Sequence, residues 1–226
     1  MKHYSFNESA EMYLKTVSEL ADNCAPVPIS AVAERLGVSP VSATEMVHRL
    51  QENGLLSHFP YRGVTLTEAG WRQAAGVVRS HRLWETFLVE HLGLSWSAAH
   101  EYACRLEHAA APEVIDALDA YLGRPVVCPH GNPIPDADGH VRYPDGCPLT
   151  EIDAGVTVVI AGIHPESDEL LSYLAELDLR PGRRIELREI APFHGPLVVN
   201  VGSETHYLSL EAAAHLFVRP LQEALA

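Results

Sequence analysis

Residues Ser97–Ala110, SAAHEYACRLEHAA, have the residue spacing of an amphipathic helix. At 100° per residue, small and apolar side chains fall on one side and polar side chains on the other. The polar side holds His100, Glu101, Cys104, Glu107 and His108. Because residues three and four apart approach one another on a helix, Cys104, Glu107 and His108 could offer sulfur, oxygen and nitrogen to one metal ion. A solvated polar face is an equally good interpretation of this pattern.

The composition of the 226-residue chain places it among globular proteins. Hydrophobic residues make up 47% of it, enough for one large domain or several small ones. No apolar run approaches the length of a membrane-spanning helix, and the first residues lack the basic and apolar blocks of an export signal. The four cysteines are too sparse for a secreted disulfide framework, so we expect a cytoplasmic protein that does not enter the membrane.

The charge of the chain limits the ways in which it could bind nucleic acid. A formal net charge of −14 argues against indiscriminate DNA binding through bulk charge, although it leaves local binding open. Thirteen histidines and thirty carboxylates are a generous supply of ligands for divalent cations. Histidine is also common as an ordinary, partly buried residue, so this count alone does not establish a metal site.

The first 73 residues have the layout of a winged helix-turn-helix. A predicted helix over residues 8–22, with Asn7 as its N-cap, is followed by a helix over residues 27–37 that Gly37 ends. The next helix begins with Ser39 as its cap and Pro40 at its first position. Two short predicted strands then flank a turn at residues 60–63 and form the wing.

Two features of this predicted DNA-binding domain stand out. Six basic and eight acidic side chains give it a net charge of −2, so helix N-termini, hydroxyl groups and the backbone would have to contact most of the phosphates. Glu45, in the predicted recognition helix, would repel phosphate unless it accepts a hydrogen bond from a cytosine amino group. Met12 points away from the apolar side of its helix, as either an ordinary exposed side chain or a soft metal ligand.

Residues 74–126 are predicted to form a helical dimerisation domain with helices over residues 68–92, 97–110 and 111–123. His81 and Glu85 lie one turn apart on the first of these helices, where they could bind one ion or each other. Residues 127–152 are rich in proline and glycine and are predicted to be a linker. The linker contains Cys128, His130, His140 and Cys147, whose spacing fits no standard zinc finger and favours a tethering loop over a metal site.

Residues 153–226 alternate like short β-strands, with one helix near residue 170, and are predicted to form a small barrel of the SH3 type. Glu166 and Glu169 lie near the start of that helix, where carboxylates commonly complement the helix dipole. The predicted fold class is therefore mainly α with a small β part: a winged helix-turn-helix, a helical dimerisation domain, and an SH3-like barrel.

The whole chain resembles the diphtheria-toxin-repressor family of metal-dependent transcriptional regulators. The resemblance is carried by SAEMYLKTV near the start, SHRLWE at residues 80–85, AHEYACRLEH at residues 99–108, and CPHGNPIP at residues 128–135. The family has a winged helix-turn-helix, a helical dimerisation domain and a C-terminal SH3-like domain. That order agrees with the divisions predicted from the residues themselves.

The resemblance implies two metal sites in each subunit. The matching positions of the primary, activating site are Met12, Cys104, Glu107 and His108. Those of the ancillary site are His81, Glu85, His100, Glu166 and Glu169, with Glu169 in place of the amide that is common there. The implied DNA-binding residues are Ser39, Pro40, Val41, Ser42, Thr44, Glu45 and Arg62. Glu45 stands where iron-sensing members often have glutamine, which leaves the operator sequence open.

The resemblance further implies a homodimer that binds double-stranded, palindromic operator DNA when Fe²⁺ or Mn²⁺ is bound, and that controls genes of metal homeostasis. Met12 and Cys104 are soft ligands and favour iron, while Co²⁺, Ni²⁺, Zn²⁺ or Cd²⁺ would substitute in vitro. One alternative is a winged-helix regulator whose signal is a small molecule or thiol oxidation at Cys104. A metal-dependent hydrolase is a third hypothesis, but the chain has no HExxH signature, so we do not expect an enzyme.

Overall fold

The structure is a computed structural model that describes residues 8–21, 26–141, 145–193 and 195–221. The expected N-cap Asn7 and the last residue of the first predicted helix lie outside these ranges. The described residues divide into two compact units. The N-terminal unit comprises residues up to His81 with Leu106–Asp116 and Pro135–Val141, and the C-terminal unit comprises Arg82–Arg105, Ala117–Ile134 and the residues from Arg142 onward. No helix in the described ranges is long and apolar enough to span a membrane.

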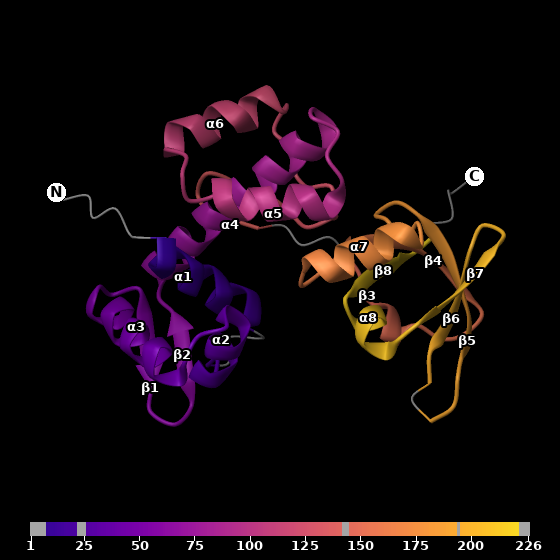
Figure 1. The fold of residues 1–226 in the computed structure, drawn as a ribbon, viewed down its shortest axis with the longest axis horizontal. Coiled ribbons are helices and arrows are strands. Elements are labelled where there is room, and N and C mark those ends of the chain that lie inside the picture. The colour runs from indigo at the N-terminus through magenta and orange to yellow at the C-terminus, as the bar shows by residue number, and fades with distance from the viewer. Residues whose placement is uncertain (1–7, 22–25, 142–144, 194, 222–226) are drawn as a thin grey trace. The chain divides into compact units, whose positions relative to one another are not determined.

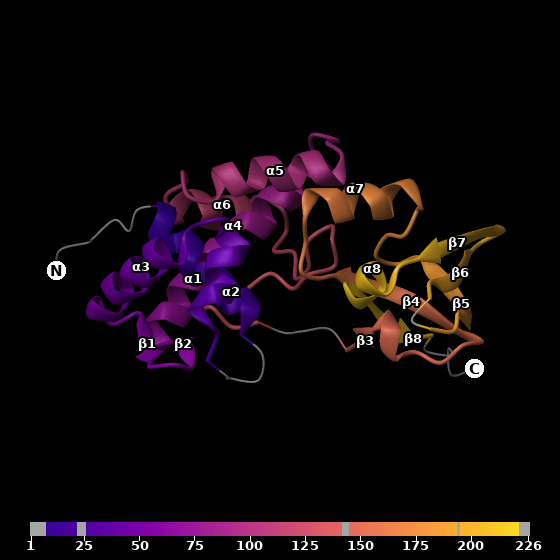
Figure 2. The ribbon, with the colours of Figure 1, turned by 60° about the horizontal axis from the view of Figure 1, so that its bottom comes forward.

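The N-terminal unit begins with three helices and a hairpin (Figure 1). They are α1 (Glu8–Leu20), α2 (Ile29–Leu36), α3 (Pro40–Glu52), β1 (Leu56–Phe59) and β2 (Gly63–Leu66). Side chains from all five elements, including Leu14, Val32, Leu50 and Val64, are buried in one apolar core. The two antiparallel strands form the hairpin predicted as the wing, and Figure 2 shows it at the foot of the helices.

The start of α3 follows the pattern of its sequence. The Ser39 side chain accepts a hydrogen bond from the Ser42 amide at 3.1 Å, and Pro40 occupies the first turn, where its missing N–H is not needed. Gly37 ends α2 in the left-handed conformation with φ of 64°, which glycine adopts at little cost. These signals lie in sequence where the predicted helix-turn-helix requires them.

Three further helices follow the hairpin: α4 (Glu68–Glu90), α5 (Trp96–Leu106) and α6 (Pro112–Tyr121). The helix predicted over residues 97–110 therefore ends earlier than its residue pattern suggested. The Ala109 amide turns back to the Leu106 carbonyl at 3.1 Å, and Pro112 disfavours a helical conformation of the residue before it and begins α6 instead. Glu107 and His108 consequently lie in a turn after α5.

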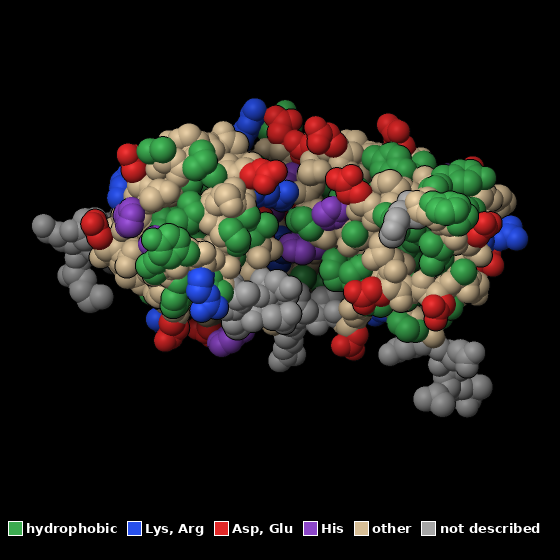
Figure 3. All heavy atoms as spheres, turned by 90° about the horizontal axis from the view of Figure 1, so that it is seen from below, with side chains coloured by type: hydrophobic (Ala, Val, Ile, Leu, Met, Phe, Trp, Pro, Cys, Tyr) green, Lys and Arg blue, Asp and Glu red, His purple; other side chains and the backbone are tan. Residues whose placement is uncertain are grey.

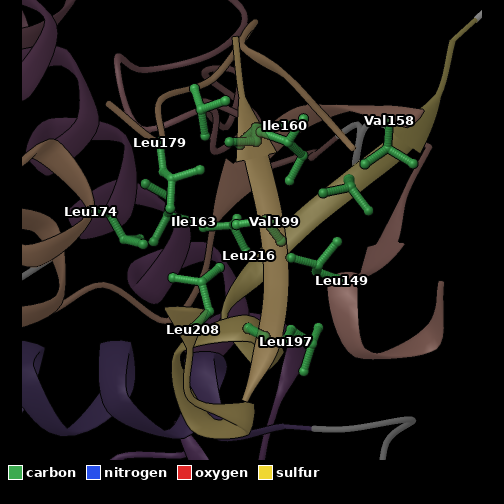
Figure 4. Packing of buried hydrophobic residues seen from close by; sticks show 14 of the residues in the cluster. Leu149, Val158, Ile160, Ile163, Leu174, Leu179, Leu197, Val199, Leu208 and Leu216 are labelled. Carbon is green, nitrogen blue, oxygen red and sulfur yellow. The ribbon is translucent and has the colours of Figure 1, made fainter. Parts of the chain in front are cut away.

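The C-terminal unit contains an antiparallel sheet with the strand order β3-β8-β4-β5-β6-β7. Its elements are β3 (Cys147–Pro148), the 3₁₀ turn η1 (Leu149–Glu151), β4 (Val156–Ile163), α7 (Asp168–Glu176), β5 (Arg184–Ile190), β6 (Leu197–Val201), β7 (Glu204–Leu208), α8 (Leu210–Ala214) and β8 (Leu216–Pro220). Register shifts in β4 and β5 bend the sheet, as bulges do. Ile160, Val199 and Leu216 point into the core of this β domain in Figure 4.

The Pro/Gly-rich segment predicted as a linker takes part in the fold. Cys128, His130 and Asn132 are buried, and β3 and η1 lie within the range predicted as linker. Gly131 has φ of 83°, and a Cβ there would lie 2.1 Å from the Ala161 carbonyl oxygen of β4. Only glycine permits this approach, so Gly131 allows the segment to pack directly against the sheet.

Candidate functional site

Glu107 is the centre of a buried polar group in the N-terminal unit. Its side chain is fully shielded from solvent, although it carries a carboxylate. One carboxylate oxygen, Oε2, lies 2.7 Å from Lys15 Nζ of α1 and 2.5 Å from His81 Nδ1 of α4. Buried carboxylates require such partners, because the charge is costly to remove from water.

His108 extends this group toward the second oxygen of Glu107. Its Nδ1 lies 2.5 Å from Glu11 Oε2 of α1, and its Nε2 lies 3.2 Å from Glu107 Oε1. Both Glu107 Oε1 and His108 Nε2 are buried, and neither has a well-aligned hydrogen-bond partner. Unsatisfied buried polar atoms are rare in folded proteins, and an oxygen and an imidazole nitrogen are ligands that Mn²⁺, Fe²⁺ and Zn²⁺ accept. The residues present therefore fit a divalent cation.

The charges of the group shift the pKa values of its members in opposite directions. Burial alone would raise the pKa of Glu107, but contacts with His108 and His81 and the charge of Lys15 lower it. The pKa of His108 is raised by its contact with Glu107 against the effect of burial, and Glu11 raises it further. Glu107 is therefore ionised at neutral pH, and a cation binding His108 through Nε2 would displace its proton.

A cavity of about 540 Å³ in the N-terminal unit is lined by this group. Glu11, Glu107 and His108 line it together with Arg79 and Ser80 of α4. Arg79 donates a hydrogen bond to the Pro135 carbonyl at 3.1 Å, which holds the loop that follows against α4. The cavity therefore lies directly beside Glu107 and His108.

A second buried group lies in the C-terminal unit and is centred on Glu85 of α4. Ligand atoms of Glu85, Cys128, His130 and Glu166 all lie within 4.8 Å of one another. His100 of α5 joins them, with Nδ1 2.8 Å from Glu85 Oε1 and 3.4 Å from Glu166 Oε2. Two carboxylates, two imidazoles and a thiol form a donor set that fits a transition-metal ion.

Neighbouring residues hold this second group in place. Asn132 donates hydrogen bonds to the Ile163 carbonyl and to Glu166 Oε1, and the Ile163 amide donates to the His130 carbonyl at 3.0 Å. The ring of Trp96 meets the His130 ring edge-on, with centroids 5.2 Å apart. Metal ligands are commonly oriented by such outer contacts.

The protonation of this second group depends on its carboxylates. Burial by itself lowers the pKa of His100, but hydrogen bonds with Cys104 and Glu85 and the charges of Glu166 and Glu85 outweigh it and raise the pKa to about 9. Burial raises the pKa of the Cys128 thiol, and Glu85 and Glu166 raise it further. Without a cation, both side chains are therefore protonated at neutral pH.

We expect the free energy of unfolding of the metal-free protein to fall as the pH rises from 6.5 to 8. His100 binds its proton more tightly when folded than when unfolded, because its pKa rises from 6.5 to about 9. Its stabilising contribution is complete below pH 6.5 and is lost as the pH rises toward 9, at up to about 1.4 kcal/mol per pH unit. Urea unfolding at several pH values between 6.5 and 8 measures this change in the free energy of unfolding. That pH range lies below the one in which thiols titrate.

The variant His100→Gln should have a visibly shallower pH dependence than the wild type. His140→Gln is the matched control, because the His140 side chain is 79% exposed. A wild-type stability that stays constant between pH 6.5 and 8, or a slope that His100→Gln leaves unchanged, would contradict the role given to His100.

The structure places the other predicted ligands as follows. Met12 is half-buried on α1, directly after Glu11, and Cys104 Sγ lies 4.0 Å from His100 Nε2 in the last turn of α5. Glu166 precedes the helix cap Ser167, whereas Glu169 is exposed on α7 and belongs to none of the metal-ligand groups among the described residues. His81 contacts Glu107, and its ring also lies within 4.8 Å of ligand atoms of Glu85, His100 and Glu166, as predicted for the ancillary site.

The four linker residues considered together as a zinc site are not brought together. Cys128 and His130 belong to the second buried group, while Cys147 pairs with Val218 in the sheet. His140 forms an exposed group with Asp136 and Asp138. Asp136 accepts hydrogen bonds from the backbone amides of residues 138 and 140, so this group has the geometry of an ordinary turn.

The predicted DNA-binding residues lie at the start of α3 and in the hairpin. Val41 is 68% exposed, and Ser39, Pro40, Ser42 and Glu45 are exposed beside it. Thr44 is half-buried and donates its hydroxyl to the Pro40 carbonyl at 2.8 Å. Arg62 lies exposed in the turn between β1 and β2. Acidic side chains are spread over the face drawn in Figure 3, in keeping with the net charge of −14.

Four residues of the two buried groups were not among the predicted ligands. Glu11 and Lys15 lie one turn apart on the polar side of α1, which was the one local signal for them. Cys128 and His130 were considered only for a linker zinc site. Their burial depends on packing against β4, which residue spacing in a Pro/Gly-rich segment does not reveal.

Family comparisons cover nearly the whole chain. Residues 5–64 match the N-terminal DNA-binding domain of iron-dependent repressors, residues 67–136 match the metal-binding and dimerisation domain of iron-dependent repressors, and residues 147–220 match the FeoA domain. The iron-dependent repressor IdeR of Mycobacterium bovis is 34% identical over 221 residues, which cover 91% of this chain and 94% of that protein. The diphtheria toxin repressor of Corynebacterium diphtheriae is 32% identical over 190 residues, covering 80% and 84%.

Solved structures agree with these relatives. The structure of a manganese-dependent transcriptional repressor in complex with manganese is 37% identical, with a TM-score of 0.85, and covers 94% of this chain and 100% of that one. The structure of ScaR with bound Cd²⁺ is 30% identical in sequence, with a TM-score of 0.85. The match covers 94% of this chain and 99% of that one. Both likenesses extend through the two compact units.

Proposed function

The chain belongs to the iron-dependent repressor family, and from this we propose that it is a dimeric transcriptional repressor activated by Fe²⁺ or Mn²⁺. It binds palindromic operator DNA and controls genes of metal homeostasis, and it acts in the cytoplasm, where operator DNA lies. This proposal is supported by the relatives along the whole chain, by the buried Glu107 and His108 side chains, and by the ligand atoms gathered around Glu85.

The proposal rests on the geometry at Glu107 Oε1 and His108 Nε2, which are buried beside Glu11 of α1, 3.2 Å apart, without a well-aligned hydrogen bond. The residues assigned to the activating site are Glu107 and His108 with Glu11, Met12 and Cys104. A bound divalent ion supplies positive charge at this place. Because α1 belongs to the DNA-binding region and Glu107 follows α5, these ligands link the two segments and fix α1 when they bind a common ion.

We assign the second metal site to Glu85, His100, Cys128, His130 and Glu166. Their ligand atoms are close together, and Glu166 comes from the β domain while Glu85 and His100 come from α4 and α5. This set keeps Glu85, His100 and Glu166 of the expected one, adds His130 and Cys128, and omits the exposed Glu169. His81 lies with Glu85, His100 and Glu166 and also contacts Glu107. An ion bound by this set would hold the β domain against α4 and α5.

Operator recognition is assigned to the exposed start of α3 and to the wing. Val41 offers an apolar contact to a thymine methyl group, and Ser39, Ser42 and Thr44 offer hydroxyl groups. Pro40 and Glu45 complete the helix surface, and Arg62 reaches the DNA backbone from the hairpin. A dimer fits two half-sites only when its two α3 helices lie about 34 Å apart, so fixing α1 selects the binding-competent spacing.

The donor sets bear on which metal activates the protein. Cys104, Cys128 and Met12 are softer ligands than carboxylate and favour Fe²⁺ over Mn²⁺, whereas Glu11, Glu85, Glu107 and Glu166 suit both. Co²⁺, Ni²⁺, Zn²⁺ and Cd²⁺ should also activate in vitro, so activation in the test tube discriminates poorly between metals. The comparison that matters is between Fe²⁺ and Mn²⁺ under anaerobic conditions.

Fluorescence anisotropy of a labelled operator palindrome tests the proposal. The protein is titrated without metal, with Fe²⁺ and with Mn²⁺, all anaerobically. We expect tight binding only with metal, and the ratio of the two metal midpoints then identifies the sensed ion. Equal binding in the presence of a chelator would instead support a metal-independent regulator, and repeating the titration with oxidised protein would test Cys104 as its sensor.

A further inference from the structure

Lys15 is a buried cation beside the activating site. It lies near the middle of α1, its side chain is 10% exposed, and its Nζ lies 2.7 Å from Glu107 Oε2. Lysine is almost never buried unless it is paired, because an unpaired ammonium is costly to remove from water. The pair connects residues 92 positions apart and joins α1 to the turn after α5.

The two oxygens of Glu107 have different surroundings. Oε2 is contacted by both Lys15 Nζ and His81 Nδ1. Oε1 faces His108 Nε2 at 3.2 Å, and both of these atoms are buried without a well-aligned hydrogen bond. Each oxygen has one imidazole beside it, but only Oε2 has an ammonium against it, so a cation is favoured at Oε1.

We propose that Lys15 is an internal counter-cation that occupies Glu107 Oε2, so that the activating ion meets Glu107 through Oε1 alone. This inference rests on the proposed function for the identity of the site. The ammonium cancels one of the carboxylate charges that attract the ion, and it repels the ion directly. Lys15 thereby makes the metal affinity of the site lower than its ligands alone would give. This raises the metal concentration at which the repressor becomes active.

The same residue has the opposite effect on the metal-free protein. There the ammonium compensates the buried charge of Glu107, and removing it leaves that carboxylate with its two imidazole contacts alone. When an ion is bound, the ion itself supplies this compensation. A charge-removing substitution should therefore weaken the metal-free fold and tighten metal binding, a combination that a merely structural residue does not produce.

The test compares Lys15→Gln with its parent by calorimetric titration with Mn²⁺ and by urea unfolding without metal. Glutamine keeps an N–H donor for Oε2 and removes only the charge. Both proteins carry His130→Gln to reduce the contribution of the second group. We expect Mn²⁺ to bind Lys15→Gln about 10- to 100-fold more tightly, and its metal-free unfolding midpoint to fall.

Two further variants keep the result interpretable. Arg35→Met removes a positive charge from the same unit at a half-exposed pair with Glu19, and it should leave Mn²⁺ affinity unchanged. Lys15→Met, which removes the donor as well, should also bind Mn²⁺ more tightly, and Mn²⁺ should restore its fold if the metal-free form is unfolded. Unchanged or weaker Mn²⁺ affinity in a folded Lys15→Gln protein overturns the proposal. Because no DNA is present, failure of metal-dependent repression would not affect this outcome.

Discussion

Glu107→Gln is expected to abolish metal-dependent operator binding. Operator affinity in saturating Mn²⁺ should fall by about 100-fold, to the level of the metal-free protein, which is the size of a typical coupling between two sites. The amide has nearly the shape of the carboxylate but cannot supply its charge to a cation. Anisotropy of a labelled operator with and without Mn²⁺ measures the loss.

The same substitution should also destabilise the metal-free protein by about 3 kcal/mol, because the buried Lys15 ammonium then loses the carboxylate charge 2.7 Å away. Glu101→Gln is the matched control. Glu101 is exposed on α5 and pairs with Arg105 at 3.1 Å across one turn, so its substitution should change stability by less than about 0.5 kcal/mol and leave operator binding intact. Mn²⁺-dependent operator binding by Glu107→Gln at wild-type strength would exclude Glu107 as an activating ligand.

Trp96→Ala is expected to have the largest effect on the C-terminal unit. Trp96 belongs to α5, yet it is 7% exposed and packs within the core of the β domain. The Arg180 guanidinium lies 4.9 Å above its ring, and the ring meets His130 edge-on. Replacing a buried tryptophan by alanine typically costs about 3 to 5 kcal/mol, and we expect a loss of this size on urea unfolding.

Metal binding at the second group should weaken as well, by about 10-fold, because Trp96 orients His130. Trp71→Ala is the control: Trp71 is 45% exposed on α4 and should tolerate the change with a much smaller loss. If Trp96→Ala unfolds at the wild-type urea concentration, the packing of α5 on the β domain does not depend on this residue. If it binds two Mn²⁺ ions per chain with wild-type affinity, neither does the orientation of His130.

The element order was predictable because its signals are local. The apolar spacing of α1 and α4, the cap at Ser39 and the glycine at Gly37 lie within a few residues of the features they specify. The end of α5 was predicted wrongly because alanines after Leu106 favour helix and give no stop signal. The ligands Glu107 and His108 consequently project from a turn, and a helical projection does not describe how they meet.

The partners of those ligands were harder to predict because they come from distant parts of the sequence. Glu11 meets His108 across 97 positions, and Lys15 meets Glu107 across 92. Their place on the polar side of α1 is equally typical of a solvated surface. Cys128 and His130 were hidden for another reason: prolines and glycines predict a loop, and only the fold shows that this loop is buried.

We propose that metal at the Glu107 group and operator DNA stabilise the same state of the protein. Reciprocity follows: DNA must tighten metal binding by the same factor by which metal tightens DNA binding. Calorimetric titration of Mn²⁺ into the metal-free protein, alone and with excess operator duplex, measures this factor directly. We expect about 10- to 100-fold tighter Mn²⁺ binding with the operator present, equal to the gain in operator affinity. Identical Mn²⁺ affinity with and without operator would contradict it.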